Sequence, residues 1–273
     1  MADPYRIRGN LHTHTTFCDG KNTPREMIER AVALGWAYIG FSGHILTPND
    51  PGYCMSPAAM EAYFDTLDAL RVEYADRIRV VAGIEHDDSL GTPPPSRAAY
   101  VIGSVHYVRA EDGALLSVDH SPATTERNIA HMGGDPLTYA EAYFSQVALL
   151  PQRTQPHIFG HFDLLTKFNE RGVVIDEEHP RYRRAWLDAM DALIPTGVHF
   201  ENNTGAISRG WRTTPYPSVP QLRHLAAHHV PVIINTDAHS AAGLDCYVNE
   251  ALALAHTLGV HLVQPEDFLA CFR

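Results

Sequence analysis

Two histidines separated by one residue are the first side chains whose type and spacing suit metal chemistry. His12 and His14 end an apolar run, and in a β-strand residues i and i+2 point to the same face. Both imidazoles can therefore reach one point, and neutral imidazole is the commonest metal ligand in proteins. Asp19 follows in a loop beside Gly20, which permits a sharp turn that brings the carboxylate to the same place. Polar residues at a strand end that face water are the alternative.

The segments that must position these residues alternate between short apolar strands and amphipathic helices. We expect strands over residues 6–14, 37–42, 78–84, 100–105, 157–160, 198–201 and 231–235. We expect helices over residues 24–34, 57–74, 137–150, 180–194, 219–228, 244–258 and 265–272. Regular alternation of strand and helix predicts a parallel sheet, here closed into an α/β barrel. The polar stretch 109–135 is expected to lie above a site rather than in the core.

Candidate ligands recur at the ends of the expected strands. They are His12, His14, His44, Glu85, His106, His161, Asp237 and His239. The carboxyl ends of the strands form the active face of α/β barrels, and scattered surface histidines would not take that position repeatedly. Asp237 and His239 repeat the spacing of the first pair. The constellation predicts a metal site, with Asp19 as the ninth candidate ligand.

Each candidate also has a structural alternative. His44 follows a glycine and suits a loop, and His106 suits a buried, hydrogen-bonded histidine. His157 competes with His161 for the fifth strand, and we favour His161 because it stands at the strand end. Glu85 ends an apolar strand, where an unpaired carboxylate is costly to bury and a metal is a natural partner. We interpret the other histidines as structural or solvated: His120, His131, His179, His199, His224, His228, His229, His256 and His261.

The donor types indicate which ions the site would take. Nitrogen and oxygen ligands without cysteine suit Zn, Mn or Fe. Nine candidates exceed the ligand set of one tetrahedral zinc, so we expect a cluster of two or three divalent ions. Such a cluster lowers the pKa of a bridging water and stabilises the attacking and leaving oxygens of an in-line phosphoryl displacement.

The composition excludes some classes of protein. The formal net charge of −11 argues against bulk nucleic-acid binding but not against a small anionic substrate beside bound cations. No apolar run reaches the roughly 18 residues of a membrane span, and the N-terminus does not resemble a signal peptide. We expect one domain over residues 1–273. The cysteines form no C-x-x-C pair, so we expect free thiols in a reducing cytoplasm: Cys18, Cys54, Cys246 and Cys271.

The motifs resemble those of the PHP (polymerase and histidinol phosphatase) family. They are His12-Thr13-His14 with Asp19, Gly43-His44, Gly83-Ile84-Glu85, Gly103-Ser104-Val105-His106, Gly160-His161-Phe162-Asp163-Leu164 and Asn235-Thr236-Asp237-Ala238-His239. Their order and spacing cover nearly the whole chain. The resemblance implies a distorted (β/α)7 TIM-like barrel. Residues 40–44, 103–107, 160–169 and 201–205 are further similar to the stand-alone histidinol-phosphate phosphatases of that family.

The same resemblance implies how the ligands divide among three metals. The first would be held by His12, His14, Glu85 and Asp237, the second by Glu85, His106 and His161, and the third by Asp19, His44 and His239. Two positions depart from the family pattern. Gly43 stands where relatives often carry an acidic residue, and His86 stands where an aliphatic residue is more usual. His86 is therefore a competing ligand or a pocket residue.

By this resemblance the chain would be a metal-dependent phosphomonoesterase that hydrolyses L-histidinol phosphate by attack of a metal-bridging hydroxide. The predicted catalytic residues are Glu85, Asp237 and His239. The leaving alkoxide would be bound to a metal or protonated by a nearby group such as Asp237 or His239. Arg209 and Arg212 follow the sixth strand, and guanidinium groups grip phosphate oxygens bidentately; a solvated basic loop is the alternative. Weaker candidates are Lys167 for phosphate, and Asp87, Asp88 and Asp163 for an acidic rim that receives the cationic end of histidinol.

Three other interpretations compete with this one. A PHP phosphoesterase for another small ester, such as a nucleotide or sugar phosphate, would be revealed by a panel of phosphomonoesters. An amidohydrolase-type barrel also opens with H-x-H, but its bridging lysine is absent here and Glu85 takes a ligand position. A metal-dependent binding module would hold metal without turnover. We expect a small-molecule partner rather than nucleic acid or membrane, and the sequence specifies no oligomeric state.

Overall fold

The computed structural model describes residues 6–47, 51–87, 93–172 and 175–270. Its strands are β1 (Gly9–Asn10), β2 (Tyr38–Phe41), β3 (Arg79–Ala82), β4 (Ile84–Asp87), β5 (Val101–Ser104), β6 (Tyr107–Arg109), β7 (Leu115–Ser117), β8 (Ile158–Phe159), β9 (His199–Asn203), β10 (Pro231–Asn235) and β11 (His261–Leu262). Its α-helices are α1 (Pro24–Ala33), α2 (Pro57–Glu73), α3 (Pro122–His131), α4 (Pro136–Thr154), α5 (Pro180–Leu193), α6 (Gly205–Ser208), α7 (Val219–Ala227), α8 (Val248–Leu258) and α9 (Pro265–Ala270).

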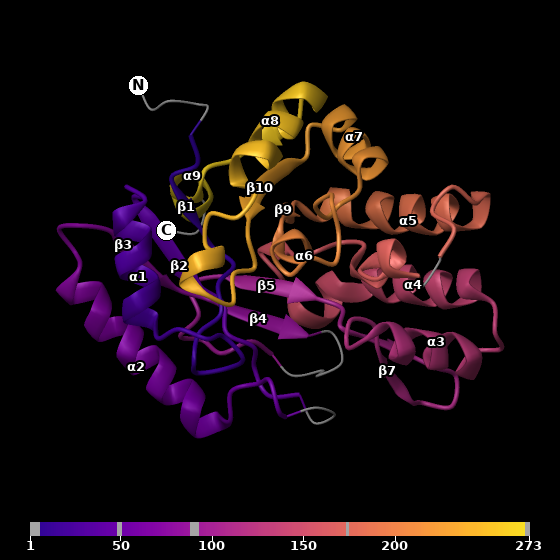
Figure 1. The fold of residues 1–273 in the computed structure, drawn as a ribbon, viewed down its shortest axis with the longest axis horizontal. Helices are drawn as coiled ribbons and strands as arrows, with labels where there is room; N and C mark the ends of the chain where they lie inside the picture. The colour runs from indigo at the N-terminus through magenta and orange to yellow at the C-terminus, as the bar shows by residue number, and fades with distance from the viewer. Residues whose placement is uncertain (1–5, 48–50, 88–92, 173–174, 271–273) are drawn as a thin grey trace.

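The strands form two parallel sheets that close into a barrel (Figure 1). One sheet contains β1, β2 and β3, and the other has the order β11-β10-β9-β8-β5-β4. The sheets meet at two seams, where isolated parallel bridges join His44 to Glu85 and Thr13 to Ala238. Because β3 and β4 are consecutive halves of one strand, the described residues supply seven barrel strands, with β11 added beside β10. The predicted distorted (β/α)7 TIM-like barrel is confirmed.

Gly83 divides the third barrel strand. β3 pairs with β2 before this glycine, and β4 pairs with β5 after it. A side chain at Gly83 would overlap the ring of Tyr100, which is fully buried and whose hydroxyl bonds to the carbonyls of Leu11 and Phe41. The strand continues past its expected end at residue 84, so Glu85 lies inside β4.

The helices cover the outer faces of the two sheets. α1 and α2 share a core with the first sheet that includes Met27 and Tyr63, whereas α4, α5 and α7 share a core with the second that includes Phe144. Thr23 caps α1 in a capping box with Glu26, as the sequence predicts for this N-cap. Prolines occupy the first position of α1 to α5. The backbone N–H at this position has no partner within a helix, so proline costs no hydrogen bond there.

The polar stretch 109–135 is an antiparallel hairpin followed by a helix. β6 pairs with β7, and α3 lies beside them, near the ends of the β4 and β5 arrows in Figure 1. Asn128 donates to the carbonyl of Ser117 at 2.7 Å, and the Val118 N–H donates to the carbonyl of His106 at 2.9 Å. Val118 and Ile129 belong to the main core. The expectation that this stretch lies outside the core is therefore wrong for these two residues.

Other expectations have mixed outcomes. The sequence pattern did not predict β6, β7, β11, α3 or α6, which are short or lie in polar segments. Cys18, Cys54 and Cys246 are free thiols, as expected, and Cys271 lies outside the described residues. Within the described ranges, no helix is both long and apolar enough to cross a membrane.

Candidate metal centre

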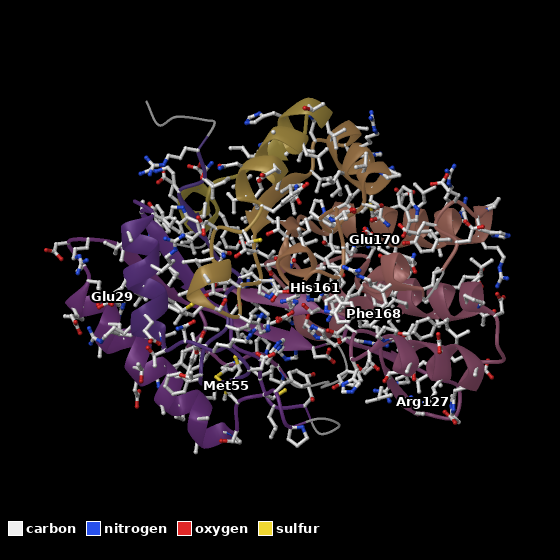
Figure 2. All side chains as sticks on the ribbon, in the orientation of Figure 1. Glu29, Met55, Arg127, His161, Phe168 and Glu170 are labelled. Atoms are coloured by element: carbon white, nitrogen blue, oxygen red, sulfur yellow. The ribbon has the colours of Figure 1, made fainter. Side chains whose placement is uncertain are left out.

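The nine predicted ligands lie together at the carboxyl ends of the barrel strands. They fall into groups whose ligand atoms lie within 4.8 Å of one another: His14, Asp19, His44 and His239; His12, Glu85 and His161; His12, His14 and Asp237; and His44, Glu85 and His106. His161 lies near the middle of the molecule in Figure 2, whereas Glu29 and Arg127 lie toward its edges. Every group combines residues from the first sheet and its loops with residues from the second.

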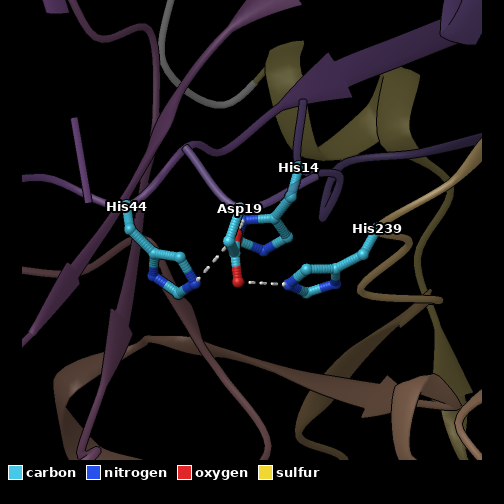
Figure 3. Close-up of side chains that lie close together, drawn as sticks. All are labelled: His14, Asp19, His44 and His239. Atoms are coloured by element: carbon cyan, nitrogen blue, oxygen red, sulfur yellow. Dashed lines mark hydrogen bonds and ion pairs between the residues drawn. The ribbon is translucent and has the colours of Figure 1, made fainter. Parts of the chain in front are cut away.

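Asp19 is the shared carboxylate of the outermost group and lies between His44 and His239 in Figure 3. Its Oδ2 is 3.1 Å from His239 Nε2, and its Oδ1 is 3.9 Å from His44 Nε2 and 3.7 Å from His14 Nδ1. Burial would raise the pKa of Asp19, but the surrounding histidines hold it well below its usual value. Asp19 is therefore an ionised carboxylate surrounded by imidazoles.

Glu85 is the buried carboxylate at the centre of the cluster. Its Oε2 lies 3.1 Å from His44 Nδ1 and 3.2 Å from His12 Nε2. Its Oε1 lies 3.0 Å from His161 Nε2 and 3.5 Å from His106 Nε2. Burial opposes ionisation of Glu85, but the adjacent histidines hold its pKa well below the usual value. His14 Nε2 also lies 3.5 Å from Oε2. Because Oε1 faces two imidazoles and Oε2 faces three, Glu85 has the placement of a bridging ligand.

His14 gives the clearest indication that the cluster fits cations. Burial, reinforced by His239 and His44, lowers the pKa of His14 to about 3, so its imidazole is neutral. Its Nε2 is buried and makes no hydrogen bond with any described residue, although Asp237 Oδ1 lies 3.2 Å away and is itself shared with His12. A buried ring nitrogen without a hydrogen bond beside ionised carboxylates fits coordination of a divalent ion.

Other histidines of the cluster have raised pKa values. Burial alone would lower the pKa of His106, but Glu85 and Asp87 raise it to about 9. Burial likewise opposes protonation of His12 and His239, and neighbouring carboxylates raise the pKa of both. Metal binding at these residues is therefore coupled to the release of protons.

Glu201 accepts hydrogen bonds from two of the segments that carry the ligands. Its Oε2 accepts hydrogen bonds from His12 Nδ1 at 2.9 Å and Asn235 Nδ2 at 3.0 Å. Its Oε1 accepts from the His161 N–H and from Asn203 Nδ2, both at 2.7 Å. Because an ionised carboxylate only accepts, Nδ1 of His12 is the donor and Nε2 faces the cluster. Sequence reasoning missed Glu201, although it ends an expected strand as the chosen ligands do.

The two predicted phosphate-binding arginines take different positions. Arg209 lines the pocket at the ligand cluster, and its guanidinium lies 2.9 Å from Asp237 Oδ2 and 3.1 Å from His239 Nδ1. Arg212 is buried, lies 3.9 Å from Asp163 Oδ2 and is not among the residues that line this pocket. The placement favours phosphate binding by Arg209 and a packing role beneath the site for Arg212.

The pocket at the ligand cluster has a volume of about 280 Å³, the size of a small metabolite. Seven of the nine predicted ligands, all except His12 and His14, line part of it together with Arg209. The rest of its lining comes from Tyr53, Tyr107, Ser117, Asp119, His120, Leu164 and Lys167. His120 is exposed, which agrees with its interpretation as structural or solvated, and it also lines the pocket. No periodic pattern marks Asp119 or His120, since both lie in the loop after β7.

The remaining candidates among the described residues join none of the ligand groups. His157 precedes β8, at the opposite end of that strand from the cluster. His86 is fully buried, contacts the carbonyl of Asp87 at 3.0 Å and belongs to none of the ligand groups formed by the described residues. Asp87 accepts two hydrogen bonds from a ligand histidine, and Asp163 is buried beside Arg212, so neither forms a pocket rim. Asp88 lies outside the described residues.

Comparison with known proteins identifies similar chains. A family model described as the PHP domain matches residues 10–205. A Deinococcus radiodurans protein named as a probable histidinol-phosphatase is 29% identical over 84% of this chain and 85% of its own length. A Bacillus subtilis protein named histidinol-phosphatase is 26% identical over 88% of this chain and 96% of its own.

A solved structure has the same fold. It is the histidinol phosphate phosphatase of Lactococcus lactis subsp. lactis, which superposes with a TM-score of 0.67 at 18% identity, over 94% of this chain and 95% of that one. That protein was crystallised in complex with zinc, L-histidinol and phosphate.

Proposed function

Because the chain belongs to the PHP domain family, we propose that it is a metal-dependent phosphomonoesterase that hydrolyses L-histidinol phosphate to L-histidinol and phosphate, a reaction of histidine biosynthesis. The observation that carries the proposal is the convergence of nitrogen and oxygen ligands around a small pocket that also holds Arg209. The names of the relatives and the ligands in the Lactococcus structure support the choice of substrate.

The ligand groups support a cluster of two or three divalent ions of Zn, Mn or Fe. The nine proposed ligands are His12, His14, Asp19, His44, Glu85, His106, His161, Asp237 and His239. One group contains Asp19, His44 and His239, the residues that the resemblance implies for the third metal, together with His14. They also place His12 beside Glu85 and His161.

The residues of the chain would bind the ester and manage its charge and protons. Bound divalent cations would supply an activated water and neutralise charge on the phosphate. Arg209 would donate to phosphate oxygens from a position fixed by its contacts with Asp237 and His239. Asp237 and His239 line the pocket beside it, and the leaving alkoxide would be bound to a cation or protonated by one of them. Although burial opposes ionisation of Asp237, Arg209 and His12 hold its pKa well below its usual value, and Asp237 would first take a proton from the attacking water. Glu85 is the third proposed catalytic residue, because both of its oxygens face the cluster.

The test is phosphate release from L-histidinol phosphate beside a panel of nucleotide and sugar phosphates, with metal content determined on the same sample. Preference for histidinol phosphate with two or three ions per chain is the expected result. Bound ions with turnover of other esters alone would overturn the substrate and retain the phosphoesterase. Bound ions without turnover of any ester would overturn the enzymatic function.

We also propose that residues 1–273 form one catalytic domain that acts in the cytoplasm. The pairing of β11 and β10 into the sheet that contains β4 supports the single domain. The free thiols among the described cysteines support a reducing compartment. A small phosphate ester, rather than nucleic acid or membrane, is the proposed partner, because the pocket is small and the formal net charge is −11.

A further inference from the structure

One carboxylate in the pocket lies outside the ligand groups. The acidic residues that line the pocket are Asp19, Glu85, Asp119 and Asp237, and Asp119 is the one among the described residues that joins no group. It follows β7, in the loop between the hairpin and α3. The proposed hydrolysis gives this side chain no role.

Asp119 is held in place by its neighbours. Lys167 Nζ donates to Asp119 Oδ2 and to its backbone carbonyl, both at 3.0 Å. The preceding residue, Val118, is fully buried and bonded to the end of β5 through the His106 carbonyl. Burial opposes ionisation of Asp119, but Lys167 and then His106 hold its pKa well below the usual value. The carboxylate is therefore charged and has a fixed position before any ligand arrives.

The carboxylate is more accessible than the ammonium that holds it. The side chain of Asp119 is 30% exposed, and that of Lys167 is 10% exposed. Lys167 bonds to one carboxylate oxygen, and no described residue donates a hydrogen bond to the other, Oδ1. This second oxygen of the partly exposed side chain can accept from a cationic donor that enters the pocket.

We propose that Asp119 is a specificity-determining residue that binds a protonated amine of the substrate while the ligand cluster and Arg209 receive the phosphate. The substrate class is then a short phosphomonoester with an ammonium group. This inference rests on the proposed function and deepens it, since L-histidinol phosphate carries both groups. Tyr53 and Tyr107, whose hydroxyls lie 3.1 Å apart, line the same pocket and place aromatic rings near a bound cation.

The experiment measures affinity for two non-hydrolysable ligands on the metal-loaded protein. One is the phosphonate analogue of L-histidinol phosphate, and the other is the same compound without its amine. Asp119→Asn keeps an oxygen for Lys167 and removes the charge. Asp112→Asn is the matched control, because Asp112 lies on the same hairpin, is exposed and does not line the pocket. Metal content and thermal unfolding show that each variant is folded and loaded.

Asp119→Asn should weaken binding of the amine ligand by about 10- to 100-fold, as expected for a lost charge-assisted hydrogen bond. Binding of the amine-free ligand should change less than about twofold, and Asp112→Asn should change neither. Equal weakening of both ligands would assign Asp119 a structural role and overturn the proposal, as would no change in either. Asp119→Ala repeats the comparison if the first variant is poorly folded.

Failure of this inference is distinct from failure of the proposed function. The inference concerns the ratio of two affinities in the variant and the wild type, and it needs no turnover. The proposed function concerns phosphate release by the wild type. If wild-type protein releases phosphate only from other esters, the same ratio is measured with 2-aminoethylphosphonate and ethylphosphonate, and its loss in Asp119→Asn still supports an ammonium site.

Discussion

Replacement of Glu201 by glutamine tests whether the hydrogen bonds that Glu201 accepts hold His12 and His161 in place. The carboxylate accepts four hydrogen bonds, two at each oxygen. An amide has one oxygen and one NH₂ group, so in either orientation its NH₂ faces two donors. One orientation places it against His12 Nδ1 and Asn235 Nδ2, and the other against the His161 N–H and Asn203 Nδ2. Two hydrogen bonds are lost in each case.

The expected effect follows from those two bonds. Hydrogen bonds to a charged group contribute about 1.5–3 kcal/mol each, and the lower cost of burying a neutral amide offsets part of the loss. We expect the free energy of unfolding of the metal-free protein to fall by about 2–4 kcal/mol. Residues that orient ligating histidines typically change metal affinity by about 10- to 100-fold, and we expect a decrease in this range because His12 loses its fixed orientation.

The assay combines urea unfolding of the metal-free protein with a competitive chelator titration. Glu141→Gln is the control, since it makes the same chemical change at an exposed residue paired with Arg181, where a surface ion pair contributes about 0–1 kcal/mol. The Glu201 variant should lose stability and metal affinity, and the control should retain both. Wild-type stability together with wild-type metal affinity in Glu201→Gln would refute the reasoning.

Three further predictions concern the cluster and the barrel interior. Glu85→Gln should lower kcat/KM by more than about 100-fold and reduce metal content, because it removes a ligand rather than a supporting group; full activity and metal content would contradict this. Metal affinity should rise with pH up to about 9, since His106 is protonated below its pKa of about 9 and must lose that proton; chelator titrations from pH 6 to 9 that show constant affinity would contradict it. Gly83→Ala should lower the free energy of unfolding by about 1–3 kcal/mol, because the added methyl overlaps Tyr100; an unchanged urea midpoint would contradict this.

The barrel was predictable from the sequence because its periodic signals are strong. The expected helix starts at Pro24, Pro57 and Pro180 match the structure, since each combines an N-cap residue with a proline. The strand ends were also informative, because the polar residues that follow apolar runs converge in a barrel. The division of one strand at Gly83 was not predictable, because it depends on contact with the ring of Tyr100, which lies just before the neighbouring strand β5.

The supporting residues could not be chosen from type and spacing alone. Glu201 ends an expected strand, but only the fold shows that it bonds to Nδ1 of His12 and does not line the pocket. Asp119 lies in a polar segment without periodicity, and its place in the pocket depends on Lys167, which lies 48 residues further along the chain. Arg209 and Arg212 look equivalent in the sequence, yet Arg212 is buried beside Asp163 and Arg209 lines the pocket.

The two seams of the barrel make the metal cluster part of the architecture. The sheets touch at the His44–Glu85 and Thr13–Ala238 bridges, and each ligand group takes members from both sides. A cation bound by any group would thus act as a cross-link between the two half-barrels. Its binding free energy would also be free energy of barrel closure. Loss of metal should then loosen the molecule along two defined lines, so protease sensitivity near residues 44 and 238 would report the filling of the site.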